Sequence, residues 1–158
     1  MSTTLISLHQ CLEQELKLAR EFIGVLEEEA QVLVNTQSET ELPRNTEKKT
    51  DYADRLSAIG RQREYWLLQM GYPSGRKGLE SAVAQHPTLE PVVNQLLFTA
   101  RRANELNNSN GVLIDTFLKN NQQTLHALRT ISGQGNLYDA RGRATPASGR
   151  GSQREVKA

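Results

Sequence analysis

Apolar residues at the start of the chain recur with the spacing of one helix face. An apolar side chain returns every seven positions, at Leu5, Leu12, Ala19, Leu26 and Leu33. Other apolar residues lie between them, and three to four apolar residues per two turns form the stripe by which a helix packs on a partner. We predict a helix over about residues 4–36. At 1.5 Å per residue it is about 50 Å long, a length typical of a bundle or coiled coil.

The next segment, residues 35–51, is polar and contains Pro43, so we predict a turn there. A second helix is expected over about residues 48–70, because its apolar residues share one face: Ala53, Leu56, Ile59, Trp66, Leu67 and Met70. Trp66 is expected to anchor the core. Glycines and Pro73 then interrupt the pattern, and a short helix is predicted for residues 79–85.

A third long helix is predicted over about residues 88–132. Thr88 is a good N-cap, and the apolar residues after it alternate spacings of four and three, as in a coiled-coil seam. Asn107 and Asn110 fall on that seam, where polar side chains cost stability and fix register. The sequence does not decide whether the helix bends at residues 107–111 or continues through them.

The apolar stripe of this last helix is wide. At 100° per residue the apolar positions after residue 105 spread over roughly 140°, which exceeds the width of one packing face. Either another helix of the chain or another protein covers the extra flank. Because only two other substantial helices are predicted, we favour a partner protein, with these residues as its binding site: Leu106, Leu113, Ile114, Phe117, Leu118, Leu125 and Leu128.

These patterns predict an all-α fold, an elongated antiparallel helical bundle or coiled coil of three main helices over residues 1–132. The remaining residues, 133–158, are rich in Gly, Ser and Arg and cannot bury enough apolar surface to fold alone. Leu137 and Tyr138 are the exception in this flexible tail. The pair is either a short linear motif or a contact that folds back onto the bundle end, and the residues leave both readings open.

Composition narrows the classes of partner and compartment. Lys+Arg 19 against Asp+Glu 18 leaves a net charge of +1, which argues against nucleic acid as the main partner. No apolar run approaches the ~20 residues that span a bilayer, and the N-terminus has no signal-peptide pattern. We therefore expect a cytoplasmic protein without stable membrane insertion. The single cysteine, Cys11, cannot form an internal disulfide and is expected to be a small semi-buried residue.

No catalytic, cofactor or metal site is predicted. His9, His86 and His126 lie in separate elements and lack metal-ligand spacing. The Gly-rich segment at residues 71–78 lacks the spacing of a phosphate loop. The carboxylates of the first helix are expected on its solvent side. We conclude that the chain is not an enzyme and needs no cofactor.

Three motifs near the C-terminus carry a resemblance to a known family. Residues 104–114 read N-x-x-N-x-x-N-G-x-L-I, residues 125–129 end a Leu-spaced helix with L-x-x-L-R, and residues 137–143 read L-Y-D-x-x-G-R. In these motifs the chain resembles the FlgN family, the flagellar export chaperones for the hook-filament junction proteins. The similarity extends more loosely over the whole chain.

The resemblance implies a cytoplasmic chaperone that binds the C-terminal helices of FlgK-like and FlgL-like hook-associated proteins. It would prevent their premature assembly and deliver them to the flagellar type III export apparatus. It also implies that the C-terminal amphipathic helix, residues 106–131 here, forms the subunit site, and that Tyr138 docks on an FlhA-like export gate protein. The alternative is a self-associating coiled-coil module unrelated to export, and the sequence leaves a homodimer open.

Overall fold

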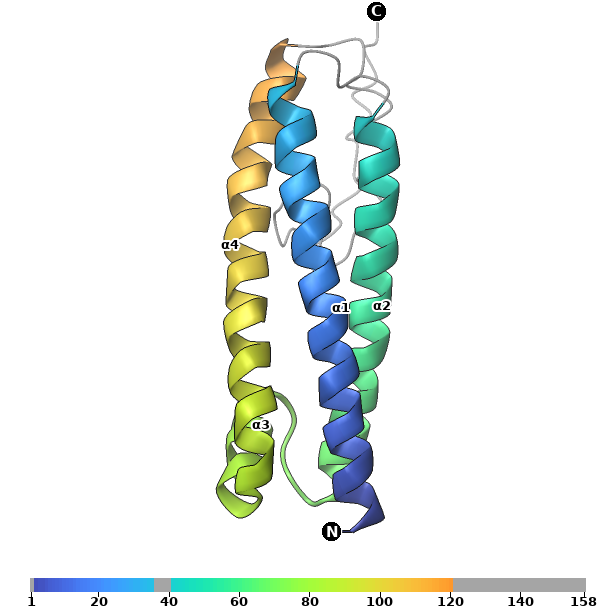
Figure 1. Cartoon of the computed structure of the whole chain (residues 1–158), viewed down its shortest axis with the longest axis vertical. Helices are drawn as coiled ribbons and strands as arrows, with labels where there is room; N and C mark the ends of the chain where they lie inside the picture. The colour runs from blue at the N-terminus through green and yellow to red at the C-terminus, as the bar shows by residue number, and fades with distance from the viewer. Residues whose placement is uncertain (1, 36–40, 121–158) are drawn as a thin grey trace, which may run out of the picture.

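The computed structural model describes residues 2–35 and 41–120, and all regular secondary structure in this part of the chain is helical (Figure 1). Its four α-helices are α1 (Thr3–Val34), α2 (Leu42–Gln69), α3 (Gly75–Gln85) and α4 (Glu90–Asn120), with a 3₁₀ turn at Pro87–Leu89 before α4. The predicted all-α class is confirmed. Three helices are long, and α3 is the short helix expected after the glycine-rich break.

The first helix matches its predicted range to within two residues at each end. Ser2 caps it, since the Ser2 hydroxyl accepts a hydrogen bond from the Leu5 backbone N–H at 3.2 Å. The helix ends at Val34, and Asn35 is extended. Every seventh-residue apolar position up to Leu26 is buried, as the periodicity predicts.

The second helix begins at Leu42, about six residues before its predicted start, so the turn expected up to residue 51 is wrong. Pro43 lies in the first turn, where no backbone N–H is needed within the helix. Three of the polar residues after it face the interior. Asn45, Thr46 and Lys49 are buried, and the Asn45 side-chain amide donates to the Val25 carbonyl at 3.2 Å.

The last described helix is unbroken from Glu90 to Asn120, so it runs straight through residues 107–111. The asparagine-rich stretch is tied to α1 instead of bending. The Asn110 amide donates to the Leu26 carbonyl at 2.7 Å, and both Asn107 and Asn110 are buried. Residues 121–132 of the predicted helix, and the predicted tail at 133–158, lie outside the described residues.

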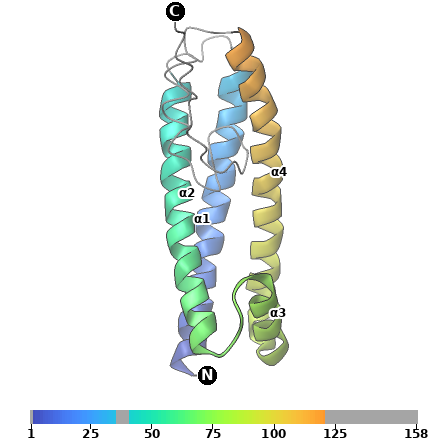
Figure 2. The ribbon, with the colours of Figure 1, turned by 180° about the vertical axis from the view of Figure 1, so that it is seen from behind.

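The long helices alternate in direction, with α2 running opposite to α1 and α4 (Figures 1 and 2). The central helix is α1, because α2 and α4 each pack chiefly on α1 and not on each other. The short helix α3 lies beside the start of α4, at the end of the molecule that holds the N-terminus (Figure 2).

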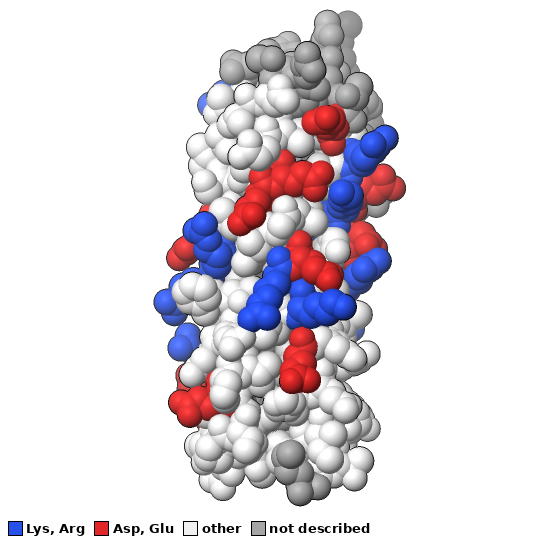
Figure 3. Space-filling view, viewed as in Figure 1, with Lys and Arg blue, Asp and Glu red and all other residues white. Residues whose placement is uncertain are grey.

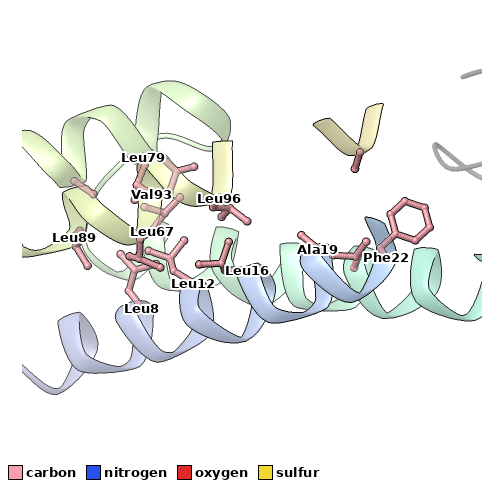
Figure 4. Packing of buried hydrophobic residues seen from close by; sticks show 14 of the residues in the cluster. Leu8, Leu12, Leu16, Ala19, Phe22, Leu67, Leu79, Leu89, Val93 and Leu96 are labelled. Carbon is pink, nitrogen blue, oxygen red and sulfur yellow. The ribbon is translucent and has the colours of Figure 1, made fainter. Parts of the chain in front are cut away.

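Most of the core belongs to one cluster, which we call the main cluster (Figure 4). The stripe of α1 supplies about half of it, and α2, α3 and α4 supply the rest. Each fully buried Leu- or Val-sized side chain contributes about 1.5–3 kcal/mol. Trp66 packs against this cluster as predicted and is half-buried. The buried members are Leu5, Leu8, Leu12, Leu16, Ala19, Phe22, Leu26, Leu56, Leu67, Leu79, Ala82, Leu89, Val92, Val93, Leu96 and Ala103.

Candidate partner-binding site

A second, smaller apolar cluster lies where α1 ends, α2 begins and α4 reaches its last described turns. Its buried members are Val32, Leu42, Ile114 and Leu118. Leu33 and Phe117 are partly buried and pack against it. This second cluster is at the opposite end of the bundle from α3 (Figure 1). With four buried residues it holds far less apolar surface than the main cluster.

The structure brings together part of the predicted binding site. Ile114 and Leu118 are 6% and 8% exposed and belong to the second cluster, with Phe117 half-buried beside them. Leu106 packs instead against the main cluster, and Leu113 is half-buried. Leu125, Leu128 and Tyr138 lie outside the described residues.

A polar layer separates the two clusters. The Lys49 ammonium donates to Glu29 Oε1 at 3.1 Å, and the Asn110 amide donates to the same oxygen at 2.9 Å. Each long helix contributes one of these three side chains, and all three are almost completely buried. Burying an ion pair this deeply is favourable only when hydrogen bonds such as that of Asn110 complete it.

The expected solvent side for the carboxylates of α1 is wrong for two of them. Glu15 and Glu29 are 7% and 0% exposed. They stand seven residues after Leu8 and Phe22, so the heptad spacing itself places them on the inner face. The sequence analysis missed these two residues because it assumed that charged side chains are exposed to solvent. It missed Lys49 for the same reason.

A second group of polar residues, which we call the second polar cluster, lies nearer to α3 than the polar layer does. It consists of Glu15, Arg63 and Glu64. The Arg63 guanidinium donates to Glu15 Oε1 and, at 3.1 Å, to Glu64 Oε1. Glu64 also accepts the Gly75 backbone N–H at 2.9 Å and so ties the start of α3 to α2. Burial raises the pKa of Glu15 above its ordinary value, and Arg63 only partly offsets that effect.

The buried thiol of Cys11 lies close to this second polar cluster. Its Sγ donates to the Ile59 carbonyl at 3.6 Å. Burial raises the pKa of Cys11 to about 11, with Glu15 adding to the rise and Arg63 opposing it. Because the thiolate is the reactive form, Cys11 has a structural role as a small buried side chain.

Neither a metal-binding group nor a membrane-spanning helix occurs among the described residues. No three of their His, Cys, Asp or Glu side chains are grouped to hold a metal ion, and no described helix is long and apolar enough to cross a membrane. Charges of both signs are mixed across the middle of the face drawn in Figure 3. The apolar features of the end of the bundle opposite α3 are the second cluster and the stripe of α4.

Comparison with known proteins shows the family to which the chain belongs. The family model described as FlgN protein matches residues 1–146, nearly the whole chain. The chain belongs to the FlgN family, whose members are chaperones in flagellum assembly. No curated protein and no solved structure matches it.

Proposed function

We propose that this protein is a cytoplasmic flagellar export chaperone for FlgK-like and FlgL-like hook-associated proteins. It binds their C-terminal helices, prevents premature assembly and delivers them to the export gate. The family match over residues 1–146 is the observation that supports this most directly. The all-helical bundle with apolar surface at one end suits the task, since an amphipathic helix binds by laying its apolar face on such a surface.

The described part of the binding surface centres on α4 beside the second cluster. Leu113 and Phe117 are half-buried there, and Val112 is 67% exposed. Ile114 and Leu118 form the underlying support, because their side chains are buried between the helices. We propose that Leu125 and Leu128, beyond the described residues, continue this surface.

Calorimetry with the C-terminal segment of an FlgK-like subunit tests the proposal. Leu113→Asp and Phe117→Asp should each weaken binding about tenfold to a hundredfold, because each removes a contact of about 1.5–3 kcal/mol. Phe98→Asp is the matched control, since Phe98 lies about four turns earlier on α4 and is 73% exposed. It should leave the affinity unchanged.

Two results would contradict this proposal. The wild-type chain could fail to bind the segment, or both variants could bind it as tightly as the wild type does. Thermal unfolding of each variant separates a lost contact from a lost fold. The variants are placed at half-buried positions, and not at Ile114 or Leu118, so that the buried members of the second cluster are kept.

We propose that Tyr138 supplies the contact with an FlhA-like export gate protein. Tyr138→Ala should leave subunit binding by calorimetry unchanged and reduce secretion of the subunit in a cellular export assay. Tyr138→Phe serves as the control that keeps the ring. Equal loss of subunit binding and export in the alanine variant would show that Tyr138 supports the fold and not the gate contact.

A further inference from the structure

A cavity of about 640 Å³ opens between α2 and α4, next to α3. Its walls are mostly apolar, and α1 contributes one side chain, Glu15. Figure 2 shows this side of the bundle, with α1 behind α2 and α4. Arg61 and Arg76 are exposed at its edge. The apolar walls are Leu56, Leu79, Leu96, Leu97 and Ala100.

Glu15 is only partly satisfied by its neighbours. Oε1 accepts from Arg63, whereas Oε2 is buried without a hydrogen-bond partner among the described residues. The residue as a whole is 7% exposed. Leaving a buried acceptor unpaired costs about 1–3 kcal/mol, and more when it is charged. A bound group that brings a donor to Oε2 would remove that cost.

The charge of the second polar cluster favours a cation as that donor. Arg63 is shared between two carboxylates, those of Glu15 and Glu64. When both are ionised, these three groups carry one unit of excess negative charge, while Arg61 and Arg76 lie exposed at the edge of the cavity, where solvent screens their charge. Hydrogen bonds between a cationic donor and a carboxylate are about twice as strong as neutral ones. A lysine or arginine side chain would therefore fit the site better than an amide or a hydroxyl.

The cavity is within reach of a helix bound at the second cluster. Leu96 and Ala100 line the cavity, and Ile114 and Leu118 lie on the same stripe of α4. From Leu96 to Leu118 this stripe extends about 33 Å, the length of a helix of roughly 20 residues. Because α2 and α4 pack chiefly on α1, little direct packing between them has to be broken for a further helix to lie there.

We propose that this cavity receives a lysine or arginine side chain of the bound subunit's terminal helix, with Glu15 Oε2 as its acceptor. The proposal rests on the proposed function and adds to it a residue that determines specificity. Glu15 selects a helix that carries one cation among its apolar residues. Arg61 and Arg76 at the edge add attraction for acidic residues on the flank of the same helix.

A double-mutant cycle tests this assignment. Each Lys and Arg of the C-terminal segment of an FlgK-like subunit is changed to Met in turn, and its affinity for the full-length chain is measured by calorimetry. One substitution should weaken binding to the wild type tenfold or more. In Glu15→Gln the same substitution should have no effect. Glu13→Gln, at an exposed position on α1, is the control and should behave as the wild type.

A second variant keeps the test decisive if Glu15→Gln folds poorly. Ala100 is exposed on the cavity wall, so Ala100→Lys should fold and place its own ammonium group toward Glu15. In Ala100→Lys, changing the critical Lys or Arg of the segment to Met should then no longer weaken binding. Ala100→Met adds similar bulk without a charge, and with it the penalty should persist.

Three outcomes would overturn the proposal. If the segment binds the wild type and no Lys or Arg shows a penalty that depends on Glu15, the inference is wrong and the proposed function stands. Tighter binding by Glu15→Gln would mean that the Glu15 carboxylate disfavours the bound segment, which is the opposite of the assigned role. If the segment does not bind the wild type at all, the proposed function and this inference fail together.

Discussion

Single residues decide how the long helices are registered. Glu29, Lys49 and Asn110 each come from a different helix, and they meet at one carboxylate oxygen, Glu29 Oε1. A shift of any helix by one turn would separate buried charges that have no access to water. Such an arrangement is stabilising only in one alignment, so it disfavours the alternative pairings that apolar stripes alone would allow.

Lys49→Met should therefore be strongly destabilising. It leaves Glu29 buried without its cation, and breaking a buried pair typically costs about 3–5 kcal/mol. Lys48→Met is a matched control, since Lys48 is half-exposed and pairs with Glu28 at 3.6 Å on the surface. Its cost should stay below about 1 kcal/mol. Urea unfolding of both variants measures the difference, and similar costs for the two would contradict the role given to the polar layer.

Among the secondary-structure elements, the spacing of apolar residues predicts which segments are helical. It predicts poorly where a helix begins when its first residues are polar. The stripe of α1 and the end of α3 at Gln85 follow from the sequence pattern, whereas α3 begins at Gly75, four residues before its predicted start. The start of α2 could not be read in this way, because Asn45 and Lys49 resemble loop residues until their partners on α1 are known. The buried carboxylate of Glu15 is similar, since its cation comes from Arg63 on another helix.

The same limit applies to the candidate site. The wide stripe of α4 is a local pattern, so residues such as Ile114 and Leu118 could be chosen from the sequence. Which part of the stripe the chain covers itself depends on Val32 and Leu42, which lie far away in sequence. The cavity beside Glu15 has walls from four helices, and no single segment of sequence could have revealed it.

The docking of α3 depends on one small residue. Gly78 is buried, and a Cβ added there would overlap the Pro73 carbonyl oxygen and approach Leu67. Gly78→Ala should displace the start of α3 and cost about 1–3 kcal/mol. Gly24→Ala is the control, because nothing lies within 4 Å of its added Cβ, and it should stabilise α1 by up to about 1 kcal/mol. Thermal unfolding would compare them, and equal melting temperatures would contradict this account.

At the scale of the molecule, the polar layer divides the bundle into two unequal parts. Within residues 2–35 and 41–120, the main cluster holds most of the buried apolar side chains, and the second cluster holds four. Regions with few buried apolar contacts open locally at a lower free energy than the rest of the fold. We therefore expect the end that carries the proposed subunit site to open at a lower free energy than the main cluster.

Hydrogen exchange should show this division directly. Backbone amides in residues 111–118 should exchange faster than those in residues 8–19, because the second cluster can open while the main cluster stays folded. Adding the subunit segment should slow the faster group. Equal protection of both groups in the free chain would mean that the bundle opens only as a whole.

The position of Trp66 has a consequence for optical studies of this protein. It is the only tryptophan in the chain, it packs against the main cluster, and its ring lies 4.9 Å from that of Tyr65. Along α2 it is about 36 Å from Leu42 and the second cluster. Its fluorescence emission therefore reports on the end that holds α3. A helix bound only at the second cluster would leave the emission unchanged, whereas a rearrangement of the main cluster around Trp66 would shift it.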